Sequence, residues 1–343
     1  MRAVRLHKPY DLRMHDEPVP QPPAGWVLIQ VKSVGVCASD VHWYRDGRIG
    51  NTAMTDPIIL GHEASGMISA LGEGVEGLKV GDRVAIEPAK PCMECEFCRA
   101  GHFNVCPGIP FFGTPPTDGC LRDYITWPAA LAIKIPDSVS YDDAAMVEPL
   151  AVGVYAAELA RISPGDTIAI LGSGAIGLSV LQAAKIAGAG RIIVSEPIPA
   201  RRELAVKLGA AQAVEPSELA DAVAGATNGR GVDIAFECSG SDEAVRDCCE
   251  IARVLGKVMI LGIPDGDTYP FVASPSRRKQ LSATFVRRSN LTTEKSIERV
   301  AAGKVDVKSY ASHHFPLGQT REAMDLAATK GDGLIRAVIV VSE

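Results

Sequence analysis

The chain has 343 residues, of which 47% are hydrophobic and 22% are charged, and its formal net charge is −6. This length exceeds one comfortable hydrophobic core and predicts two domains of an ordinary globular protein. The acidic balance argues against nucleic acid as a partner, because phosphate backbones attract basic stripes. The apolar runs are too short to cross a membrane, and the N-terminal residues MRAVRLHKPYDLRM lack the apolar region of a secretory signal. We therefore expect a cytoplasmic protein without a membrane segment.

The first 150 residues are predicted to be mostly β. Short β-branched segments at 27–31, 58–60 and 83–86 are separated by turn signals such as LGEGVEG. Residues 87–120 are rich in Cys, Pro and Gly, which favours a long loop. Helical periodicity follows at 147–162.

From residue 165 the pattern changes to strands that alternate with helices, which predicts a parallel sheet of βαβ units. Strands are expected at 166–171, 191–195, 231–237 and 257–261, and helices at 176–187, 201–208 and 242–255. The alternation stops after about residue 285, and the tail ends in a predicted strand at 337–341. We expect this tail to pack back on the first domain.

The first βα junction reads ILGSGAIGLSV, in which Gly172, Gly174 and Gly177 fit G-x-G-x-x-G. In this pattern the first glycine makes a tight turn, the second lets the backbone approach a pyrophosphate, and the third lets helix and strand pack closely. The free N–H groups of the following helix then face the phosphates. The alternative is a packing turn without a ligand, but the strand before and the helix after it favour dinucleotide binding.

The second predicted strand is followed by Glu196, which comes after Gly172 at about the spacing of a ribose-binding acid. A carboxylate there accepts hydrogen bonds from the ribose hydroxyls and repels a 2′-phosphate. This favours NAD over NADP. Arg201 and Arg202 lie nearby, and arginine accommodates a 2′-phosphate, so NADP stays the alternative.

Four of the nine cysteines form the series Cys92-x2-Cys95-x2-Cys98-x7-Cys106. Four thiolates on one short loop can close a tetrahedral shell around zinc, which leaves no position for a substrate. We therefore predict a structural zinc site. Free thiols in a loop are the alternative, and so is a redox C-x-x-C pair, although redox pairs usually begin a helix of a βαβ unit.

A zinc ribbon that binds nucleic acid is the best hypothesis outside the enzymes. It predicts a basic surface around the cysteines. The segment instead contains Glu94 and Glu96 beside Arg99.

Three further segments, VGVCASDVHWY, LGHEASG and MVEPLAVG, each place a possible metal ligand near a turn. Cys37 offers a thiolate, His62 an imidazole nitrogen, and either Glu63 or Glu148 a carboxylate. Such ligands together with a water or a substrate describe an open, catalytic zinc site. Each residue also has an ordinary interpretation, because a single cysteine is commonly core and a single glutamate is usually on the surface.

The fragments SVGVCASDVHWYRDGRIG, LGHEASG, GDRVAIEP, TPPTDG, VEPLAVG and LGSGAIGL resemble the sorbitol (L-iditol) dehydrogenase-like polyol dehydrogenases, a group of the zinc-dependent medium-chain dehydrogenases. The resemblance runs from about residue 20 to the C-terminus. It implies a mixed α/β protein with a GroES-like catalytic domain at 1–152 and 287–343, a structural-zinc lobe at about 88–110, and a Rossmann NAD-binding domain at 153–286.

The resemblance also implies the ligands of the catalytic zinc, namely Cys37, His62 and Glu63. Glu148 is then a nearby ligand that coordinates directly or through water. In such a site zinc favours loss of the proton from a substrate hydroxyl, and a hydride passes from the same carbon to the nicotinamide. Ser39 and His42 are expected to pass the proton to solvent.

The remaining implied contacts divide between cofactor and substrate. Further cofactor contacts are expected at Ile176, Glu196, Arg201, Leu261, Gly262, Ile263, Phe285 and Val286. Substrate contacts are expected at Trp43, Tyr44 and Arg287. Phe111 and Phe112 are expected to form an apolar wall of the substrate site, with buried packing of the loop as the alternative for either. The chain departs from the polyol group at two places, where it reads FVRRSN instead of an Arg–Tyr pair after phenylalanine, and Trp–Tyr instead of Tyr–Trp after the Cys37 loop.

The predicted reaction is reversible oxidation of a secondary hydroxyl of a sorbitol-, xylitol- or galactitol-like polyol to a ketose. Dehydrogenases of L-threonine or butanediol are the alternatives within the superfamily, and a zinc-ribbon protein on a vestigial Rossmann scaffold is the alternative outside it. Two zinc ions per chain are expected, one catalytic and one structural. The expected assembly is a homo-oligomer, with a tetramer favoured over a dimer.

Overall fold

The computed structural model describes residues 1–342, which form two compact units. Unit 1 comprises Met1–Glu148 together with the segment from Thr293 onward, and unit 2 comprises Pro149–Thr292. The tail of the chain therefore belongs to unit 1. The functional limits at residues 152/153 and 286/287 remain a prediction. None of the helices within residues 1–342 is long and apolar enough to cross a membrane.

Unit 1 is mostly β. Its strands are β1 (Arg2–Lys8), β2 (Asp11–Asp16), β3 (Trp26–Gly35), β4 (Arg48–Ile49), β5 (Thr52–Ala53), β6 (Ile58–Ile59), β7 (Glu63–Leu71), β8 (Arg83–Ile86), β9 (Tyr124–Pro128), β10 (Ala132–Lys134), β17 (Ala311–Pro316) and β18 (Arg336–Val340). Its helices are α1 (Ala38–Asp46), α2 (Glu96–Arg99), α3 (Tyr141–Ala145), α10 (Thr293–Ala301) and α11 (Thr320–Thr329). Short 3-10 turns lie at Phe103–Val105, Ala129–Leu131, Lys308–Tyr310 and Leu317–Gln319.

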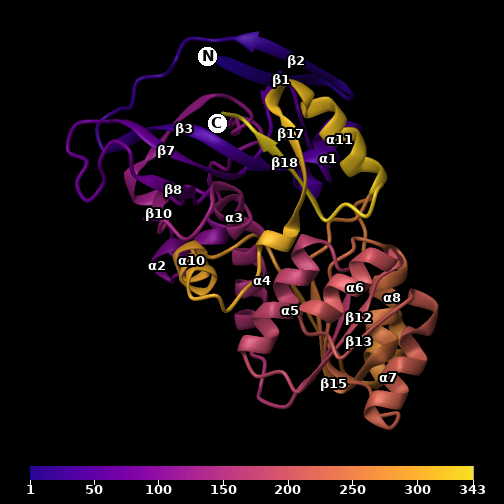
Figure 1. Ribbon diagram of the computed structural model, residues 1–343. Helices are drawn as coiled ribbons and strands as arrows, with labels where there is room; N and C mark the ends of the chain where they lie inside the picture. Colours follow the sequence, from indigo (N-terminus) through magenta and orange to yellow (C-terminus); the bar gives the residue numbers. More distant parts are fainter. Residues whose placement is uncertain (343) are drawn as a thin grey trace. The chain divides into compact units, whose positions relative to one another are not determined.

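The largest sheet of unit 1 has the order β10-β8-β7-β3-β18-β17, and β9 also pairs with β3. The β3 sequence WVLIQVKSVG is buried over nearly its whole length, as a strand covered on both faces requires. β18 pairs antiparallel with β3, which places Val338 opposite Gly35. Figure 1 shows the yellow C-terminal strands beside the indigo N-terminal ones. The beginning and the end of the chain thus build one core.

Unit 2 alternates strands and helices. Helix α4 (Val147–Ala160) begins at the end of unit 1 and continues into unit 2. It is followed by β11 (Thr167–Leu171), α5 (Ala175–Ile186), β12 (Arg191–Ser195), α6 (Pro199–Leu208), β13 (Gln212–Val214), α7 (Leu219–Thr227), β14 (Val232–Glu237), α8 (Asp242–Ile251), β15 (Ala252–Ile260), α9 (Ala273–Arg278) and β16 (Ser282–Phe285), with a 3-10 turn at Pro216–Glu218.

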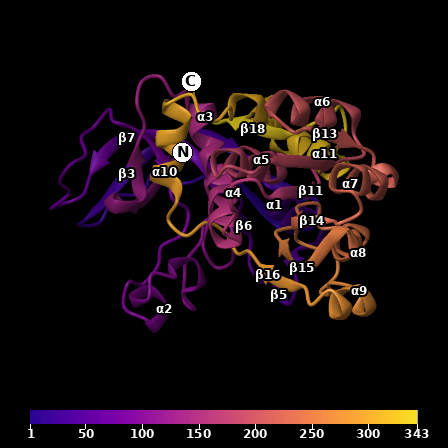
Figure 2. The same cartoon turned by 90° about the horizontal axis from the view of Figure 1, so that it is seen from below.

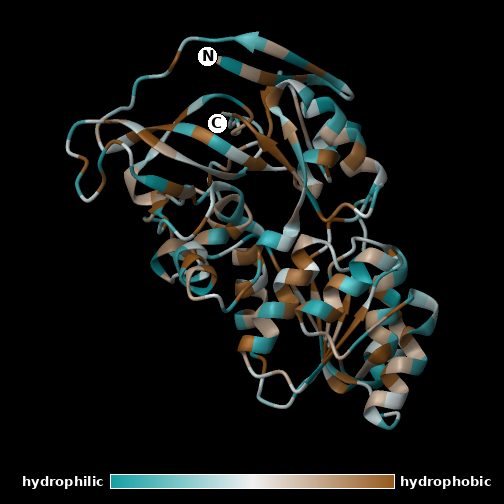
Figure 3. Ribbon diagram, in the orientation of Figure 1, coloured by the Kyte–Doolittle hydropathy of each residue, from teal (hydrophilic) through white to brown (hydrophobic). Residues whose placement is uncertain are grey.

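The six strands of unit 2 form a parallel sheet of order β13-β12-β11-β14-β15-β16. Numbered within the unit this is 3-2-1-4-5-6, the strand order of the doubly wound dinucleotide-binding fold. Figure 3 shows mostly hydrophobic strands between helices that carry both hydrophilic and hydrophobic residues. The order reverses between β11 and β14, and in such sheets ligands bind beyond the carboxyl ends of the strands at that place.

The predicted helix over 242–255 is wrong in its last turn. Helix α8 ends at Ile251, and Ala252 already pairs with Val232 of β14. The Arg253 side chain donates to Asp233 of β14 at 2.7 Å, and Leu255 has a positive φ of 60° that a helix does not allow. Tertiary pairing therefore overrides local helical periodicity here.

The expectation of one tail strand after residue 285 was incomplete. The structure adds two amphipathic helices, α10 and α11, and the strand β17. The predicted loop at 87–120 likewise contains the short helix α2.

Candidate active site

The N-terminus of α1 is organised by one buried carboxylate. Cys37 is the N-cap residue, and its backbone N–H donates to Asp40 Oδ2 at 2.9 Å. The other oxygen, Asp40 Oδ1, accepts the backbone N–H of Gly61 at 3.0 Å and lies 3.6 Å from His62 Nδ1. Because Asp40 is only 1% exposed, it fixes the start of α1 against the turn that carries His62. Sequence reasoning did not single out Asp40, although an acid three residues after an N-cap is a capping signal.

Three of the predicted ligands converge at this place. One ligand atom from each of Cys37, His62 and Glu63 lies within 4.8 Å of the other two. Glu63 is the first residue of β7 and pairs with Gly35, so the β3–β7 register carries its side chain to the end of β3 that leads into Cys37. A thiol, an imidazole and a carboxylate are the donor types of an open zinc site.

The burial of these groups has clear electrostatic consequences. Burial alone would lower the pKa of His62, but the neighbouring Asp40 and Cys37 raise it well above its usual value. Burial raises the pKa of Glu63, and the opposing charges of Arg336 and His62 reduce that shift. Metal binding must therefore displace protons from this cluster.

Arg336, the first residue of β18, is a functional residue that sequence reasoning missed. Its Nη2 lies 3.0 Å from Glu63 Oε1, and its Nη1 donates to the Val36 carbonyl at 3.0 Å. The fully buried oxygens of Glu63 accept no hydrogen bond of good geometry, although the guanidinium is close. The Glu63 carboxylate thus has charge compensation and retains lone pairs that face the cluster.

Glu148, the second residue of α4, stands outside the three-ligand group. It is 7% exposed, and burial raises its pKa to about 7, with the Glu63 carboxylate adding to the rise and His62 opposing it. The two carboxylates are therefore close enough to interact, but the structure brings Glu63, rather than Glu148, to Cys37 and His62.

Ser39 and His42 lie three residues apart on α1 and therefore on one face of that helix. Both side chains are half-buried. His42 Nδ1 is 3.5 Å from Asp46 Oδ2, one turn further along the helix. The helix thus carries a hydroxyl, an imidazole and a carboxylate in succession away from Cys37.

The predicted substrate contacts separate into two groups. Phe111 lies against the His62 ring, with a centroid distance of 5.1 Å. Phe112 instead packs on Trp127 in the core, at 4.0 Å between centroids. Trp43 and Tyr44 also belong to the core of unit 1.

Two of these predicted substrate contacts have partners within the protein, and their contact with a substrate stays a prediction. The Tyr44 hydroxyl donates to Asp325 at 2.7 Å, so the donor meant for a substrate already has a protein partner. Phe112 has its face covered by Trp127. Arg287, in unit 2, is exposed.

The four cysteines lie on a lobe that contains α2 and stands apart from the sheets of unit 1 (Figure 2). Their sulfur atoms all lie within 4.8 Å of one another. Backbone N–H groups point at the sulfurs, from Cys95 to Cys92 at 3.3 Å and from Cys98 to Cys95 at 3.4 Å. Hydrogen bonds from the backbone of Glu94 and Cys95 lower the pKa of Cys92 to about 6, and burial raises that of Cys98 to about 12.

In unit 2 the predicted cofactor residues gather at the carboxyl edge of the sheet. The glycine turn follows β11, Glu196 follows β12, Leu261–Ile263 follows β15, and Phe285 ends β16. A Cβ atom at Gly177 would collide with the Gly172 carbonyl, which explains the third glycine of the motif. Ile263 and Phe285 are exposed at this edge.

Glu196 is 3% exposed and holds the glycine turn in place. Its carboxylate accepts the backbone N–H of Ser173 at 2.7 Å and that of Ile198 at 3.1 Å. Arg201 is buried and lies close to this turn. A Cβ atom added at Gly174 would lie 3.9 Å from Arg201 Nη1. Arg202 Nη1 donates to the backbone carbonyls of Glu196 and Pro197, both at 2.8 Å, and its Nη2 forms an ion pair with Glu215 at 2.9 Å.

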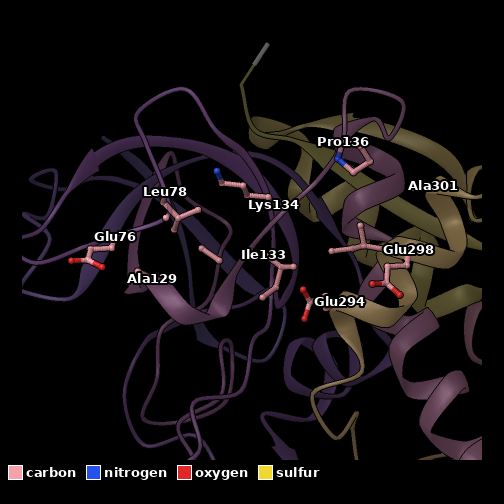
Figure 4. Close-up of a pocket in the computed structure, with 12 residues that line it drawn as sticks. Glu76, Leu78, Ala129, Ile133, Lys134, Pro136, Glu294, Glu298 and Ala301 are labelled. Atoms are coloured by element: carbon pink, nitrogen blue, oxygen red, sulfur yellow. The ribbon is translucent and has the colours of Figure 1, made fainter.

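A shallow groove of about 530 Å³ also lies on unit 1 (Figure 4). Its apolar floor includes Leu78 and Ile133, and Glu76, Glu294 and Glu298 stand along it. None of its lining residues is among the predicted site residues, so it has no part in the site described above.

The fold and the ligand set define a zinc-binding dehydrogenase. The family model for the alcohol dehydrogenase GroES-like domain matches residues 23–137, and the model for zinc-binding dehydrogenases matches residues 175–302. The chain belongs to this family of zinc-dependent medium-chain alcohol dehydrogenases and is an oxidoreductase. The prediction of a GroES-like domain joined to a Rossmann domain is confirmed.

Full-length relatives place the chain in the polyol dehydrogenase group of this family. It is 40% identical to the sorbitol dehydrogenase of Bacillus subtilis over 95% of this chain and 93% of that protein. It is 38% identical to the D-xylulose reductase of Morganella morganii, over 88% and 90%. Its fold matches a solved Escherichia coli oxidoreductase/dehydrogenase of unknown specificity involved in membrane biogenesis, with a TM-score of 0.94, 32% identity and coverage of 100% and 99%.

Proposed function

We propose that this enzyme oxidises a secondary hydroxyl of a polyol to the ketose with NAD as the hydride acceptor, and that it catalyses the reverse reduction. The observation that carries this proposal is the convergence of Cys37, His62 and Glu63 in a chain 40% identical to a sorbitol dehydrogenase. The match to a D-xylulose reductase supports the same reaction class, a polyol–ketose interconversion.

The residues present fit a catalytic zinc ion. The donor set is one sulfur, one nitrogen and one carboxylate, and the buried Glu63 oxygens keep lone pairs free of hydrogen bonds. Zinc bound there supplies Lewis-acid activation of a hydroxyl or carbonyl oxygen. We assign Glu148 the role of a nearby zinc ligand, direct or through water, because it is close enough to interact with Glu63. The four-cysteine lobe fits a second, structural zinc ion, because four sulfurs complete a tetrahedral shell.

The protein's own groups position and balance this site. Asp40 lies 3.6 Å from His62 Nδ1 and helps to fix the orientation of the ring. Arg336 compensates the charge of Glu63. The α1 face with Ser39 and His42 takes the proton from the substrate hydroxyl and passes it toward solvent, with Asp46 beside His42 at the end of the helix. Phe111 covers the His62 ring and limits the access of water.

The preference for NAD rests on Glu196 and Arg202. A buried carboxylate next to the glycine turn repels a 2′-phosphate. Arg202, which could have neutralised that phosphate, donates instead to the Glu196 and Pro197 carbonyls and pairs with Glu215. Arg201, beside Gly174, lies where its guanidinium can contact the dinucleotide's own phosphates.

We also infer that the enzyme is a homo-oligomer, with a tetramer favoured. β16 ends the sheet of unit 2 as an edge strand, and within the described residues no further strand pairs with it. Such an edge is a suitable surface for pairing with a second copy. Sedimentation analysis of the purified protein tests this.

The direct test is a screen of C4–C6 polyols, with butanediol, L-threonine and sugar acids as the alternatives, against NAD and NADP, followed by the absorbance of the reduced cofactor. The proposal predicts the highest kcat/KM for a polyol with NAD. A preference for butanediol or L-threonine would move the enzyme to another branch of its family. Failure to bind NAD, with a single zinc per chain, would instead favour the zinc-ribbon hypothesis.

A further inference from the structure

Glu237 is a buried acid that no part of the proposed chemistry uses. It is the last residue of β14 and is fully buried. β14 is central in the sheet, and Glu237 is aligned with Leu171 of β11 on one side and Ile260 of β15 on the other. The side chain therefore lies at the carboxyl edge, at the place where the strand order reverses.

The Glu237 carboxylate joins two loops that are separate in sequence. Its Oε1 accepts the backbone N–H of Ser239 at 2.7 Å, the Ser239 hydroxyl at 2.7 Å and the backbone N–H of Gly240 at 2.8 Å. Its Oε2 accepts the backbone N–H of Gly262, in the loop after β15, at 3.2 Å. The backbone carbonyl of Glu237 adds a bond from Leu261 N–H at 2.9 Å.

The two loops are closely packed against each other. A Cβ atom at Gly262 would collide with Gly240 N and with Glu237 Oε2. The Gly262 carbonyl is held from the other side by the Tyr269 hydroxyl at 2.9 Å. The first of these loops also borders the glycine turn, because a Cβ atom at Gly172 would lie 3.0 Å from Ser239 N.

All four groups that face the carboxylate are hydrogen-bond donors. An ionised carboxylate, which only accepts, is therefore matched to its surroundings, and an amide of the same size is not, because its NH2 group would face a donor. Charge-assisted bonds of this kind are among the stronger ones in a protein. The charge of Glu237 thus fixes the relative position of the loops at 239–240 and 261–263.

We propose that Glu237 is a positioning residue for the dinucleotide: it preorganises these two loops beside the glycine turn and so sets the affinity for NAD and NADH. This inference rests on the proposed cofactor site, in which Leu261, Gly262 and Ile263 contact the dinucleotide. Glu237 itself does not take part in hydride or proton transfer.

The test compares Glu237→Gln with Asp233→Asn, a matched change near the other end of the same strand. Asp233 is also a buried carboxylate, and it bonds Thr167 N–H, Arg230 and Arg253. NADH affinity is measured by fluorescence titration of the zinc-loaded enzyme. Glu237→Gln is expected to raise the Kd for NADH and the KM for NAD by roughly 10-fold or more, with a smaller change in kcat and in the KM for the polyol. Asp233→Asn is expected to lower Tm and to leave the Kd for NADH unchanged.

Hydrogen exchange of the cofactor-free protein gives a readout that does not depend on activity. In Glu237→Gln the amides of Ser239, Gly240 and Gly262 should exchange faster, while those of the β14 strand interior stay protected. If the glutamine variant does not fold, Glu237→Asp is measured in the same way, because the shorter side chain cannot reach both loops. A Kd for NADH that stays within about twofold of the wild type, in a folded variant, overturns the inference. Absence of NADH binding by the wild type would instead overturn the proposed function.

Discussion

The two clusters of metal-ligand residues in unit 1 are built in opposite ways. Cys37, His62 and Glu63 come from separate segments, and the main sheet, α1 and the buried Asp40 bring them together. The four cysteines are all contained in residues 92–106, on a lobe held at the sulfurs by short-range N–H···S contacts. The tertiary structure therefore positions the ligands of the first cluster. The local structure of the lobe, in contrast, is expected to depend on metal binding by the second cluster.

The chemistry of the ligands follows this difference. A mixed set of three ligands in a preformed frame leaves a position open for a substrate, and removing the metal leaves the frame standing. Four thiolates close the shell, so a metal bound there is expected to contribute folding free energy and no reactivity. In the proposed function, zinc would therefore serve catalysis at the first cluster and stability at the second.

The largest expected effect comes from Cys37→Ser. This change removes a ligand from the open site while the sheet and α1 remain, so turnover should fall by at least about a thousandfold, because Lewis-acid activation is worth several kcal/mol. Zinc analysis should show the loss of one ion per chain, with Tm nearly unchanged. A variant that keeps both zinc ions and its activity would break the comparison at once.

Cys98→Ser should produce the converse result. Cys98 is buried in the lobe, and without it the shell cannot close, so we expect a Tm lower by roughly 5 °C or more and rapid proteolysis between residues 88 and 110. The remaining folded enzyme should keep kcat within a few-fold. Loss of kcat without a loss of stability would show that the lobe takes part in the chemistry.

Ser39→Ala separates proton transfer from metal binding within the open site. Removing the hydroxyl should lower kcat by about 10- to 100-fold, because positioned acid–base groups contribute on that order. The zinc content should stay at the wild-type value, because alanine is a good helix former and suits this position in the first turn of α1. Unchanged turnover would remove Ser39 from the relay, and a lost zinc ion would show a structural role in the open site.

The smallest effect on activity and zinc content is expected from Asp233→Asn. Because Asp233 belongs to neither cluster, this variant shows the consequence of a stability change alone. Although burial raises the pKa of Asp233, bonds from Arg230, Arg253 and the Thr167 N–H lower it well below its usual range. The stability from this group is therefore fully present above the ordinary carboxyl pKa of about 4 and is lost as the pH falls below it.

The variant should be less stable than the wild type by about 2 kcal/mol at pH 7, and this gap should narrow below about pH 4. Urea unfolding across this pH range measures it. A stability difference that grows toward acid pH would show that folding raises the pKa of Asp233 instead of lowering it. Zinc content and the Kd for NADH should not change.

The sequence predicted the residues of both clusters. The four cysteines of the lobe are recognisable from their local spacing, and the ligands of the open site stand out as unusual residue types in short motifs. Asp40, Arg336 and Glu237 are ordinary charged residues, and only the tertiary structure shows what they bond to. Arg336 reaches Val36 across the pairing of the two ends of the chain, which no local pattern reveals.

Side-chain direction was the other property that the sequence did not determine. Phe111 and Phe112 are adjacent, yet only Phe111 faces His62. Tyr44 appeared suited to a polyol hydroxyl, but its own hydroxyl is bonded to Asp325. The end of α8 was misjudged because Ala252 is taken up by the β14–β15 pairing.

In the proposed function, the cluster of Cys37, His62 and Glu63 binds the catalytic metal and the cysteine lobe binds a structural one. The most direct measurement is zinc content and activity of one preparation before and after brief treatment with a zinc chelator. We expect a fall from two zinc ions to one per chain, complete loss of activity with the circular dichroism unchanged, and recovery of both zinc and activity on adding zinc. Full activity after loss of the more labile zinc ion would contradict it.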